Sequence, residues 1–177
     1  MEYRIVYLIK GKAEKYHKKL IKDLAKEYNQ SVPPKVFPSH ATLKYRFETN
    51  RIKELESLLK NFVKKQKLAK IKIKRTMQFH DRVACLKLDF SKEANQVYKN
   101  LKKELEKISW LTWKEQDKML GKFHSSLIFN EDPKEFKKIW KDTSKIKINF
   151  DLNFDNLAIL KRSRKYWKIH KVFRIND

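Results

Sequence analysis

Residues 39–43 read Ser-His-Ala-Thr-Leu, and residues 123–127 read Phe-His-Ser-Ser-Leu. Each segment contains a His-x-(Thr/Ser) step followed by leucine, and the two segments lie in opposite halves of the chain. Both alternate as strands, so each histidine and the hydroxyl residue two positions later share one face. The repetition predicts two similar halves, each with one strand that presents an imidazole and a hydroxyl.

The order of elements around these segments also repeats. Apolar residues at helical spacing predict helices, and alternating or continuous apolar runs predict strands. We expect helices over residues 12–28, 52–63, 92–108 and 133–140. We expect strands over residues 3–9, 40–47, 71–79, 83–90, 122–129, 146–152, 157–160 and 166–175, and a proline-containing loop over residues 30–38.

This order predicts an α/β (α+β) fold in which residues 1–177 form one bilobal domain. The two lobes are small antiparallel sheets backed by helices and related by a pseudo-twofold axis. A groove between two such lobes is the natural place for a site, so we expect the active site there.

The composition indicates a polyanionic partner. The chain of 177 residues carries a formal net charge of +23, which favours binding to RNA or DNA. Lysine outnumbers arginine 36 to 8, so a codon bias toward lysine is the alternative explanation. No apolar stretch approaches the ~18 residues of a membrane span. Cys85 is the only cysteine, which excludes an intrachain disulfide and suits a reducing cytoplasm.

His40 and His124 are the candidate catalytic residues. Phosphodiester chemistry needs one group that takes a proton from the attacking oxygen and another that gives a proton to the leaving oxygen. Imidazole can do either near neutral pH. Thr42 and Ser126 could donate hydrogen bonds to nonbridging phosphate oxygens. The alternative is that these histidines are ordinary polar residues on exposed strand faces.

Strict alternation adds cations to the two histidine faces. Lys44 and Arg46 fall on the face of His40, and Lys122 falls on the face of His124. We predict that these three cations bind substrate, with Arg46 able to grip a phosphate bidentately. A surface ion pair is the alternative for Arg46.

The remaining histidines and tryptophans lack this pattern. His17, His80 and His170 are expected to be non-catalytic. The histidines and the single cysteine have no zinc-ligand spacing, so no metal or cofactor is predicted. Trp110 and Trp113 could stack on a base, although tryptophans in such a loop more often seal a lobe.

The two motifs resemble those of the two-histidine (2H) phosphoesterase superfamily. Within it the chain is most similar to the bacterial and archaeal branch of 2′-5′ RNA ligases and RNA 2′,3′-cyclic phosphodiesterases. The resemblance assigns His40, Thr42, His124 and Ser126 to the catalytic site. It also implies a bilobal fold and metal-independent phosphoester chemistry on RNA ends or small nucleotides.

We therefore expect a cytoplasmic, monomeric phosphodiesterase that acts on RNA 2′,3′-cyclic phosphate ends or 2′-5′-linked phosphodiesters. The same site could catalyse 2′-5′ ligation in reverse. The expected partners are RNA ends or cyclic nucleotides, with no membrane. The alternatives are an RNA-end exonuclease that uses the 2′-hydroxyl as nucleophile, and a non-catalytic basic RNA-binding module.

Overall fold

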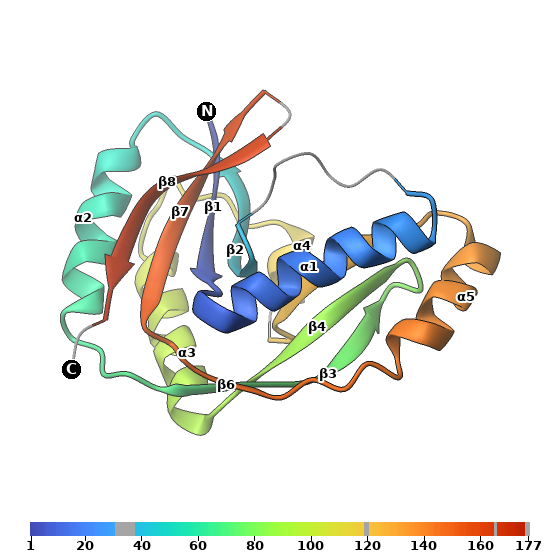
Figure 1. Ribbon diagram of the computed structural model, residues 1–177. Coiled ribbons are helices and arrows are strands. Elements are labelled where there is room, and N and C mark those ends of the chain that lie inside the picture. Colours follow the sequence, from blue (N-terminus) through green and yellow to red (C-terminus); the bar gives the residue numbers. More distant parts are fainter. Residues whose placement is uncertain (31–37, 119–120, 165, 176–177) are drawn as a thin grey trace.

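The computed structural model describes residues 1–30, 38–118, 121–164 and 166–175 (Figure 1). Its elements in chain order are β1 (Glu2–Leu8), α1 (Gly11–Glu27), β2 (His40–Glu48), α2 (Ile52–Val63), β3 (Lys70–Phe79), β4 (Val83–Phe90), α3 (Lys92–Glu106), α4 (Glu115–Lys118), β5 (His124–Phe129), α5 (Pro133–Thr143), β6 (Phe150–Asn153), β7 (Asn156–Ser163) and β8 (Tyr166–Arg174).

The strands form two four-stranded antiparallel sheets, with the orders β2-β1-β7-β8 and β5-β4-β3-β6. The unit β1-α1-β2 corresponds to the unit that runs from β4 through α3 to β5. In each unit the histidine strand lies at the edge of its sheet, beside the strand that precedes it in the chain. The predicted fold class is confirmed: two small antiparallel sheets with helices.

The two sheets do not coincide with the two halves of the chain. β3 follows α2 but pairs with β4, and β7 follows β6 but returns to pair with β1. Each sheet thus combines strands from both halves. A single hydrophobic cluster, which extends from Tyr3 to Ile175 in sequence, includes buried residues from both sheets and from the helices.

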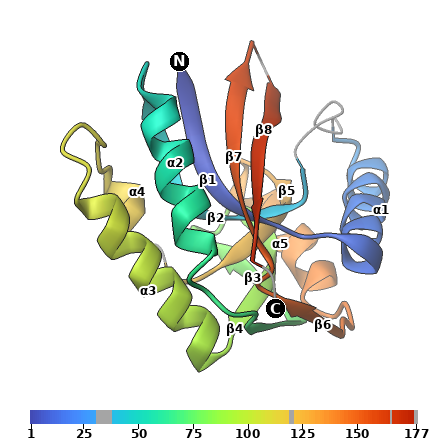
Figure 2. The same ribbon diagram turned by 90° about the vertical axis from the view of Figure 1, so that its left-hand side faces the viewer.

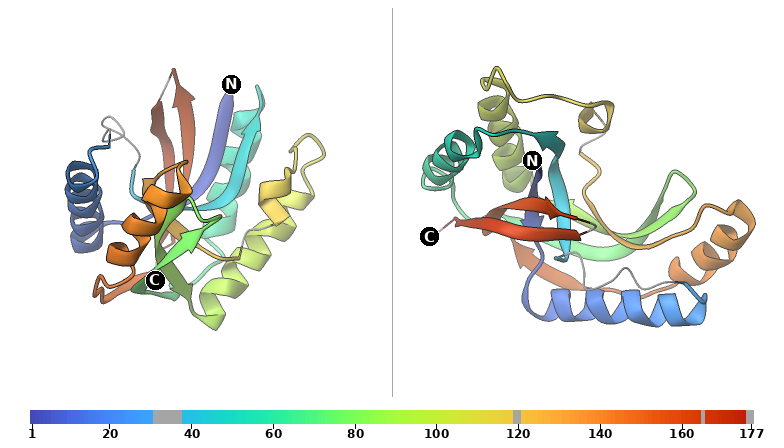
Figure 3. Two further views of the ribbon diagram at one scale, coloured as in Figure 1. Left: turned by 90° about the vertical axis from the view of Figure 1, so that its right-hand side faces the viewer. Right: turned by 90° about the horizontal axis from the view of Figure 1, so that it is seen from above.

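The helices cover opposite sides of the sheets. Figures 2 and 3 show α2 and α3 on one side and α1 and α5 on the other. The amphipathic pattern explains this placement: in α2, Leu55, Leu59 and Phe62 lie on one face and are buried. Ser91 caps α3 by accepting a hydrogen bond from the amide of Ala94.

Several element boundaries differ from the prediction, and one short helix was missed. α5 continues past residue 140 to Thr143, because Ile139 and Thr143 extend its buried face. β6 begins only at Phe150, since the amide of Ile146 still donates to the carbonyl of Thr143 in the turn after α5. The four-residue α4 was not predicted, because it is too short to show helical periodicity. Most of the predicted loop over residues 30–38 lies outside the described residues.

Within the described ranges, every helix is too short or too polar to cross a membrane.

Candidate active site

The strand β2 contains a β-bulge immediately after its motif. Thr42 lies opposite Val6, and the next partner pair is Lys44 with Ile5, so Leu43 is an extra residue. A bulge reverses which face the following side chains occupy. Lys44 and Tyr45 therefore do not follow the alternation that the sequence suggested, and a second register shift between Ile5 and Tyr3 restores it by Phe47.

The strand β5 contains the same bulge at the same place. Ser126 lies opposite Cys85 and Ile128 lies opposite Ala84, so Leu127 is the extra residue. In both motifs the bulge falls on the leucine that follows the hydroxyl residue. The two motifs are thus equivalent in backbone register as well as in sequence.

The bulge in β2 removes Lys44 from the histidine face, so the prediction that Lys44 binds substrate is wrong. Its side chain is 0% exposed and lies in the protein interior, whereas the next residue, Tyr45, lines the cleft described below. Strict alternation predicted the reverse, with Lys44 on the histidine face and Tyr45 on the other face. It took no account of the extra residue Leu43.

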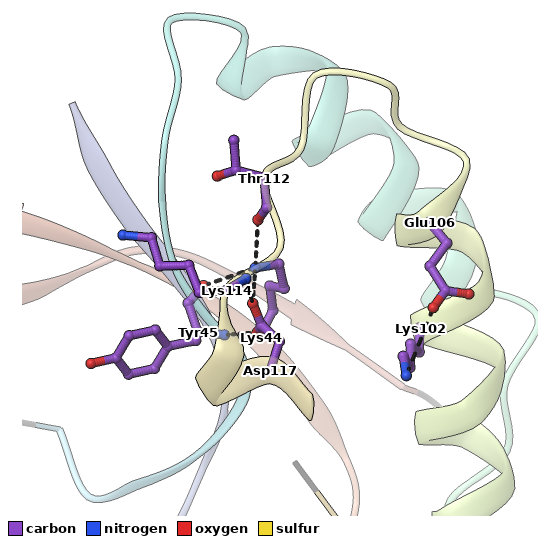
Figure 4. Close-up of polar contacts among 7 residues, drawn as sticks. All are labelled: Lys44, Tyr45, Lys102, Glu106, Thr112, Lys114 and Asp117. Carbon is purple, nitrogen blue, oxygen red and sulfur yellow. Dashed lines mark hydrogen bonds and ion pairs between the residues drawn. The ribbon is translucent and has the colours of Figure 1, made fainter. Parts of the chain in front are cut away.

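Lys44 instead belongs to a buried ion pair that holds the segment before β5 against β2 (Figure 4). Its Nζ donates to Asp117 Oδ2 at 2.7 Å and to the carbonyl of Thr112 at 2.9 Å. The other oxygen of Asp117 accepts from the amide of Tyr45 at 2.8 Å. Burial lowers the pKa of Lys44, and its bond to Asp117 opposes that change.

A cleft of about 1250 Å³ brings the two motifs together. His40 and Thr42 from β2 line it, as do His124 and Ser126 from β5, and these two strands are in contact. The sequence placed these four residues on one surface, and the structure gathers them around one space.

The other two cations that were predicted to bind substrate are Arg46 and Lys122. Among the described residues, those that line the cleft do not include Arg46 or Lys122. Arg46 is 41% exposed and forms an ion pair with Glu2, with Nε 3.6 Å from Oε1. Lys122 is exposed at the approach to β5.

The two imidazoles are oriented by the same kind of hydrogen bond. His40 Nδ1 donates to the carbonyl of Pro38 at 2.6 Å, and His124 Nδ1 donates to the carbonyl of Lys122 at 2.9 Å. Each acceptor lies two residues before its histidine. Because a carbonyl can only accept, Nδ1 carries the proton in the neutral ring and Nε2 carries the lone pair.

The surroundings of His40 favour its neutral form. Burial is the main cause that lowers its pKa to about 4, and electrostatic interactions with Arg4 and with the imidazoles of His17 and His124 lower it further. The bond to the Pro38 carbonyl acts in the opposite direction. His40 is therefore uncharged at neutral pH, as a proton acceptor must be. The ring of His124 stacks on Phe79, with 4.7 Å between centroids.

A third histidine, which was expected to be non-catalytic, joins the two motif strands. His17 on α1 is only 4% exposed, and its Nε2 lies 3.0 Å from the carbonyl of Ser126 and 3.1 Å from Ser125 Oγ. Its Nδ1 lies 2.8 Å from Ser39 Oγ. Nε2 therefore carries the proton, and Nδ1 accepts from the Ser39 hydroxyl.

His17 thus contacts the residue before His40 and the two residues after His124. Burial lowers the pKa of His17, which keeps this arrangement neutral. His17 falls on the same helical face as Ala13 and Leu24, and that buried face was the signal available in the sequence. Its partners could not be read from the sequence, because they lie on two distant strands.

An arginine of the cleft was also not predicted from the sequence. Arg4 on β1 and Trp167 on β8 line the cleft together with Tyr45. The guanidinium carbon of Arg4 lies 4.0 Å from the centre of the Trp167 ring and 5.8 Å from that of Tyr45. Arg4 thus supplies the positive charge that Lys44 was expected to supply.

The remaining candidates lie elsewhere. His170 Nε2 is bonded to Glu56 at 2.8 Å, and His80 lies in the turn between β3 and β4. Trp110 packs against the core and donates to Glu54, and Trp113 lies over Lys44. Across the described part of the chain, no group of three or more His, Cys, Asp or Glu side chains could hold a metal ion.

The fold is similar to that of several solved structures. Escherichia coli LigT complexed with 3′-AMP superposes with a TM-score of 0.62 at 13% identity, over 99% of this chain and 98% of that one. The protein TT0787 of Thermus thermophilus superposes with a TM-score of 0.60 at 11% identity, over the same shares. LigT complexed with phosphate gives 0.57 at 10% identity, again over 99% and 98%.

No curated protein matches the chain in sequence. A family profile described as the 2′-5′ RNA ligase superfamily matches residues 13–165, which include both histidine motifs. With most of the sequence matched, the chain belongs to the 2′-5′ RNA ligase superfamily of two-histidine phosphoesterases.

Proposed function

We propose that this protein is a phosphodiesterase that acts on RNA 2′,3′-cyclic phosphate ends or 2′-5′-linked phosphodiesters, and that the same site can run in reverse as a 2′-5′ RNA ligase. The observation that carries the proposal is the equivalence of the two motifs. Each supplies to one cleft an imidazole fixed through Nδ1 and a hydroxyl two residues later.

In the proposed mechanism His40 is the general base. As a water oxygen attacks the phosphorus of a cyclic phosphate, its proton passes to His40 Nε2. A protonated His124 gives its proton to the ester oxygen that leaves, so one P–O bond forms and one breaks. Thr42 and Ser126 donate to the nonbridging oxygens, where negative charge increases in the transition state.

The assignment of His40 as base rests on its lowered pKa. A reaction that needs one base and one acid leaves the acid role to His124. In the ligation direction a 5′-hydroxyl takes the place of water, and the same residues act in the same roles.

The structures of the relatives support a nucleotide phosphate as ligand. LigT, whose fold this chain shares, is known as complexes with 3′-AMP and with phosphate. In this protein Lys18 and Lys22 from α1 and Lys168 from β8 line the cleft and would attract the RNA backbone. We therefore propose RNA ends as the physiological partner, captured through this basic rim.

The test is incubation with the four nucleoside 2′,3′-cyclic monophosphates in the presence of EDTA. We expect turnover that persists in the chelator, because the imidazoles, hydroxyls and Arg4 supply the proton transfers and charge stabilisation. The phosphate position in the product shows which ester bond breaks. Tight RNA binding without turnover would support the RNA-binding module, and a strict need for a terminal 2′-hydroxyl in RNA degradation would support the exonuclease.

We expect the acid limb of the pH profile of kcat/KM to lie near pH 4 rather than near 6.5. This limb reports protonation of the free enzyme's base, and burial lowers the pKa of His40 to about 4. Initial rates between pH 3.5 and 7 check this range directly. A limb near 6.5 would mean that His40 is not the base.

The same shift links pH to stability. Since the unfolded chain protonates His40 near 6.5 and the folded chain near 4, unfolding takes up a proton between these values. The contribution of His40 to stability is full above pH 6.5 and falls as the pH drops toward 4. Denaturant titrations of wild type and His40→Gln should differ in pH dependence in this window, and parallel curves would contradict the shift.

We expect His17→Leu to lower kcat by about 10- to 100-fold, because small misplacement of reacting groups has effects of this size. His17→Gln should recover most of the loss, since its amide can donate to Ser126 and accept from Ser39. KM should change less than kcat, because the binding groups remain. His170→Leu, which removes an imidazole bound to Glu56, is the control and should leave kcat unchanged. Equal kcat in wild type and His17→Leu would refute the positioning role.

A further inference from the structure

Three arginines meet on the cleft face of the sheet that carries His40. Glu2, Arg4 and Val6 alternate on one face of β1, and Val6 packs with Trp167 in the small apolar cluster on that face. Arg162 on β7 binds Glu2, with Nη1 2.7 Å from Oε2. Arg46 on β2 approaches the other oxygen of Glu2, so Glu2 holds two of the arginines beside the third.

The residue type argues against codon bias at this place. The chain has 36 lysines but only eight arginines, so a bias toward lysine codons does not explain three arginines in one patch. Arginine differs from lysine by its planar fork of donors, which matches two oxygens of a phosphate. The choice of arginine in a lysine-rich chain therefore indicates recognition of an oxyanion.

The guanidinium of Arg4 is fixed in position and has a buried donor that a ligand could satisfy. Its guanidinium stacks on Trp167, and its Nε is buried without a hydrogen-bond partner among the described residues. The Nε of Arg46 also lacks a hydrogen bond among the described residues, although it lies 3.6 Å from Glu2 Oε1. A stacked guanidinium keeps the donors at its edge available, and an unpaired buried donor is costly unless a ligand satisfies it.

The charges of the three arginines also oppose one another. Burial lowers the pKa of Arg4 to about 10, and the positive charges of Arg46 and Arg162 contribute to this decrease, while Glu2 and Tyr45 oppose it. An anion bound among them would relieve the repulsion. Glu48, which lies opposite Glu2 in register, is exposed and does not replace such an anion.

The position of Arg4 relative to the motif suggests which anion binds. Thr42 lies opposite Val6, and Arg4 is two residues farther along β1, a separation of about 7 Å along the strand. One ribose can span such a gap between two phosphates. A 2′,3′-cyclic phosphate closes the 3′ end of its chain, so any second phosphate must be on the 5′ side.

We propose that Arg4, Arg46 and Arg162 form a second phosphate site, which takes the phosphate on the 5′ oxygen of the nucleotide whose 3′ end lies between His40 and His124. The proposal rests on the proposed function for the placement of that 3′ end. It makes the preferred substrate a nucleotide with a phosphate on both sides of its ribose, as at the end of an RNA chain. An isolated nucleoside 2′,3′-cyclic phosphate has no 5′-phosphate, so it would leave the second phosphate site empty.

The test is calorimetric titration with adenosine 3′-monophosphate and with adenosine 3′,5′-bisphosphate. We expect wild type to bind the bisphosphate about 10- to 100-fold more tightly, the range for hydrogen bonds between charged groups. Arg4→Gln and Arg46→Gln should each reduce this ratio severalfold or more. Arg46 is 41% exposed, so its variant should fold even if Arg4→Gln does not.

The matched control is Arg51→Gln. Arg51 also lies over a tryptophan, 5.7 Å from the Trp110 ring, and its replacement removes the same single charge. The control should keep the wild-type ratio. If Arg51→Gln lowers the ratio as much as Arg4→Gln, the preference comes from the overall charge and the second site is refuted. A wild-type ratio near one would also refute it.

A further ligand tests whether the second site accepts a phosphodiester, as inside an RNA chain, as well as a terminal 5′-phosphate. The dinucleotide ApA with a 3′-phosphate presents this group as a diester, as RNA does, and should show the same dependence on Arg4 and Arg46. These binding ratios are measured without any turnover of the ligands. If the protein bound as described but hydrolysed no cyclic phosphate, the proposed reaction would fail and the second site would stand.

Discussion

His40→Ala and His124→Ala should each lower turnover of a 2′,3′-cyclic phosphate by about 10²–10⁴-fold, the usual contribution of one general acid or base. Each replacement removes one of the two cleft imidazoles that we propose to transfer protons. The double variant should be little worse than the poorer single variant, because the two residues act as a unit. Steady-state rates on one cyclic nucleotide measure all three variants.

The controls for this result are the fold and an unrelated imidazole. Unfolding midpoints should show that the variants are folded at the assay temperature, and His170→Ala should retain wild-type turnover. Near-wild-type activity in either single variant would mean that the paired acid–base mechanism is wrong, whatever the similarity of the two motifs.

Asp117→Ala should destabilise the protein by about 3–5 kcal/mol, the range for breaking a buried ion pair by removing one partner. The replacement leaves the ammonium of Lys44 0% exposed and without its carboxylate. It also removes the acceptor for the amide of Tyr45, so the cleft wall should be disturbed as well. Chemical denaturation, followed by circular dichroism, measures the free energy of unfolding.

Two comparisons test whether the unpaired charge of Lys44 causes this loss of stability. Replacing both partners, as Lys44→Met with Asp117→Leu, should recover much of the lost stability, because no buried charge remains. Glu106→Ala breaks the exposed pair with Lys102, whose Nζ lies 3.7 Å from Oε1, and should cost less than about 1 kcal/mol (Figure 4). A loss of that small size for Asp117→Ala would show that Lys44 can reach water.

The features that depend on local patterns could be predicted from the sequence. The spacing of apolar residues gave α2 its correct bounds, Ile52–Val63, and the two strands joined at residues 80–82 were correct within one residue. The repeated motif was sufficient to expect His40 and His124 in one cleft. These features are set by residues close together in the chain, which periodicity can detect.

The errors have specific physical causes. Lys44 was assigned to the wrong face, because one extra residue in β2 shifts the alternation and nothing in the segment 40–48 marks a bulge. The register became clear only from the pairing with β1. Asp117, the partner of Lys44, lies in a four-residue helix that has no periodic signature.

The residues that were missed act through distant partners. His17 is bonded to Ser39 and to residues of β5, and Arg4 stacks on Trp167 near the other end of the chain. Such contacts depend on which strands become neighbours. Strand order is decided by the whole fold, so a single sequence does not reveal these partners.

The exchange of strands between the two halves also affects how the chain can fold. β1 lies between β2 and β7, and Val6 pairs with Ala158. During synthesis one edge of β1 has no partner until β7 has emerged, and such edges attract other chains. The contact order of this sheet is therefore high, so folding should be slow and the N-terminal half alone should aggregate rather than form a stable lobe.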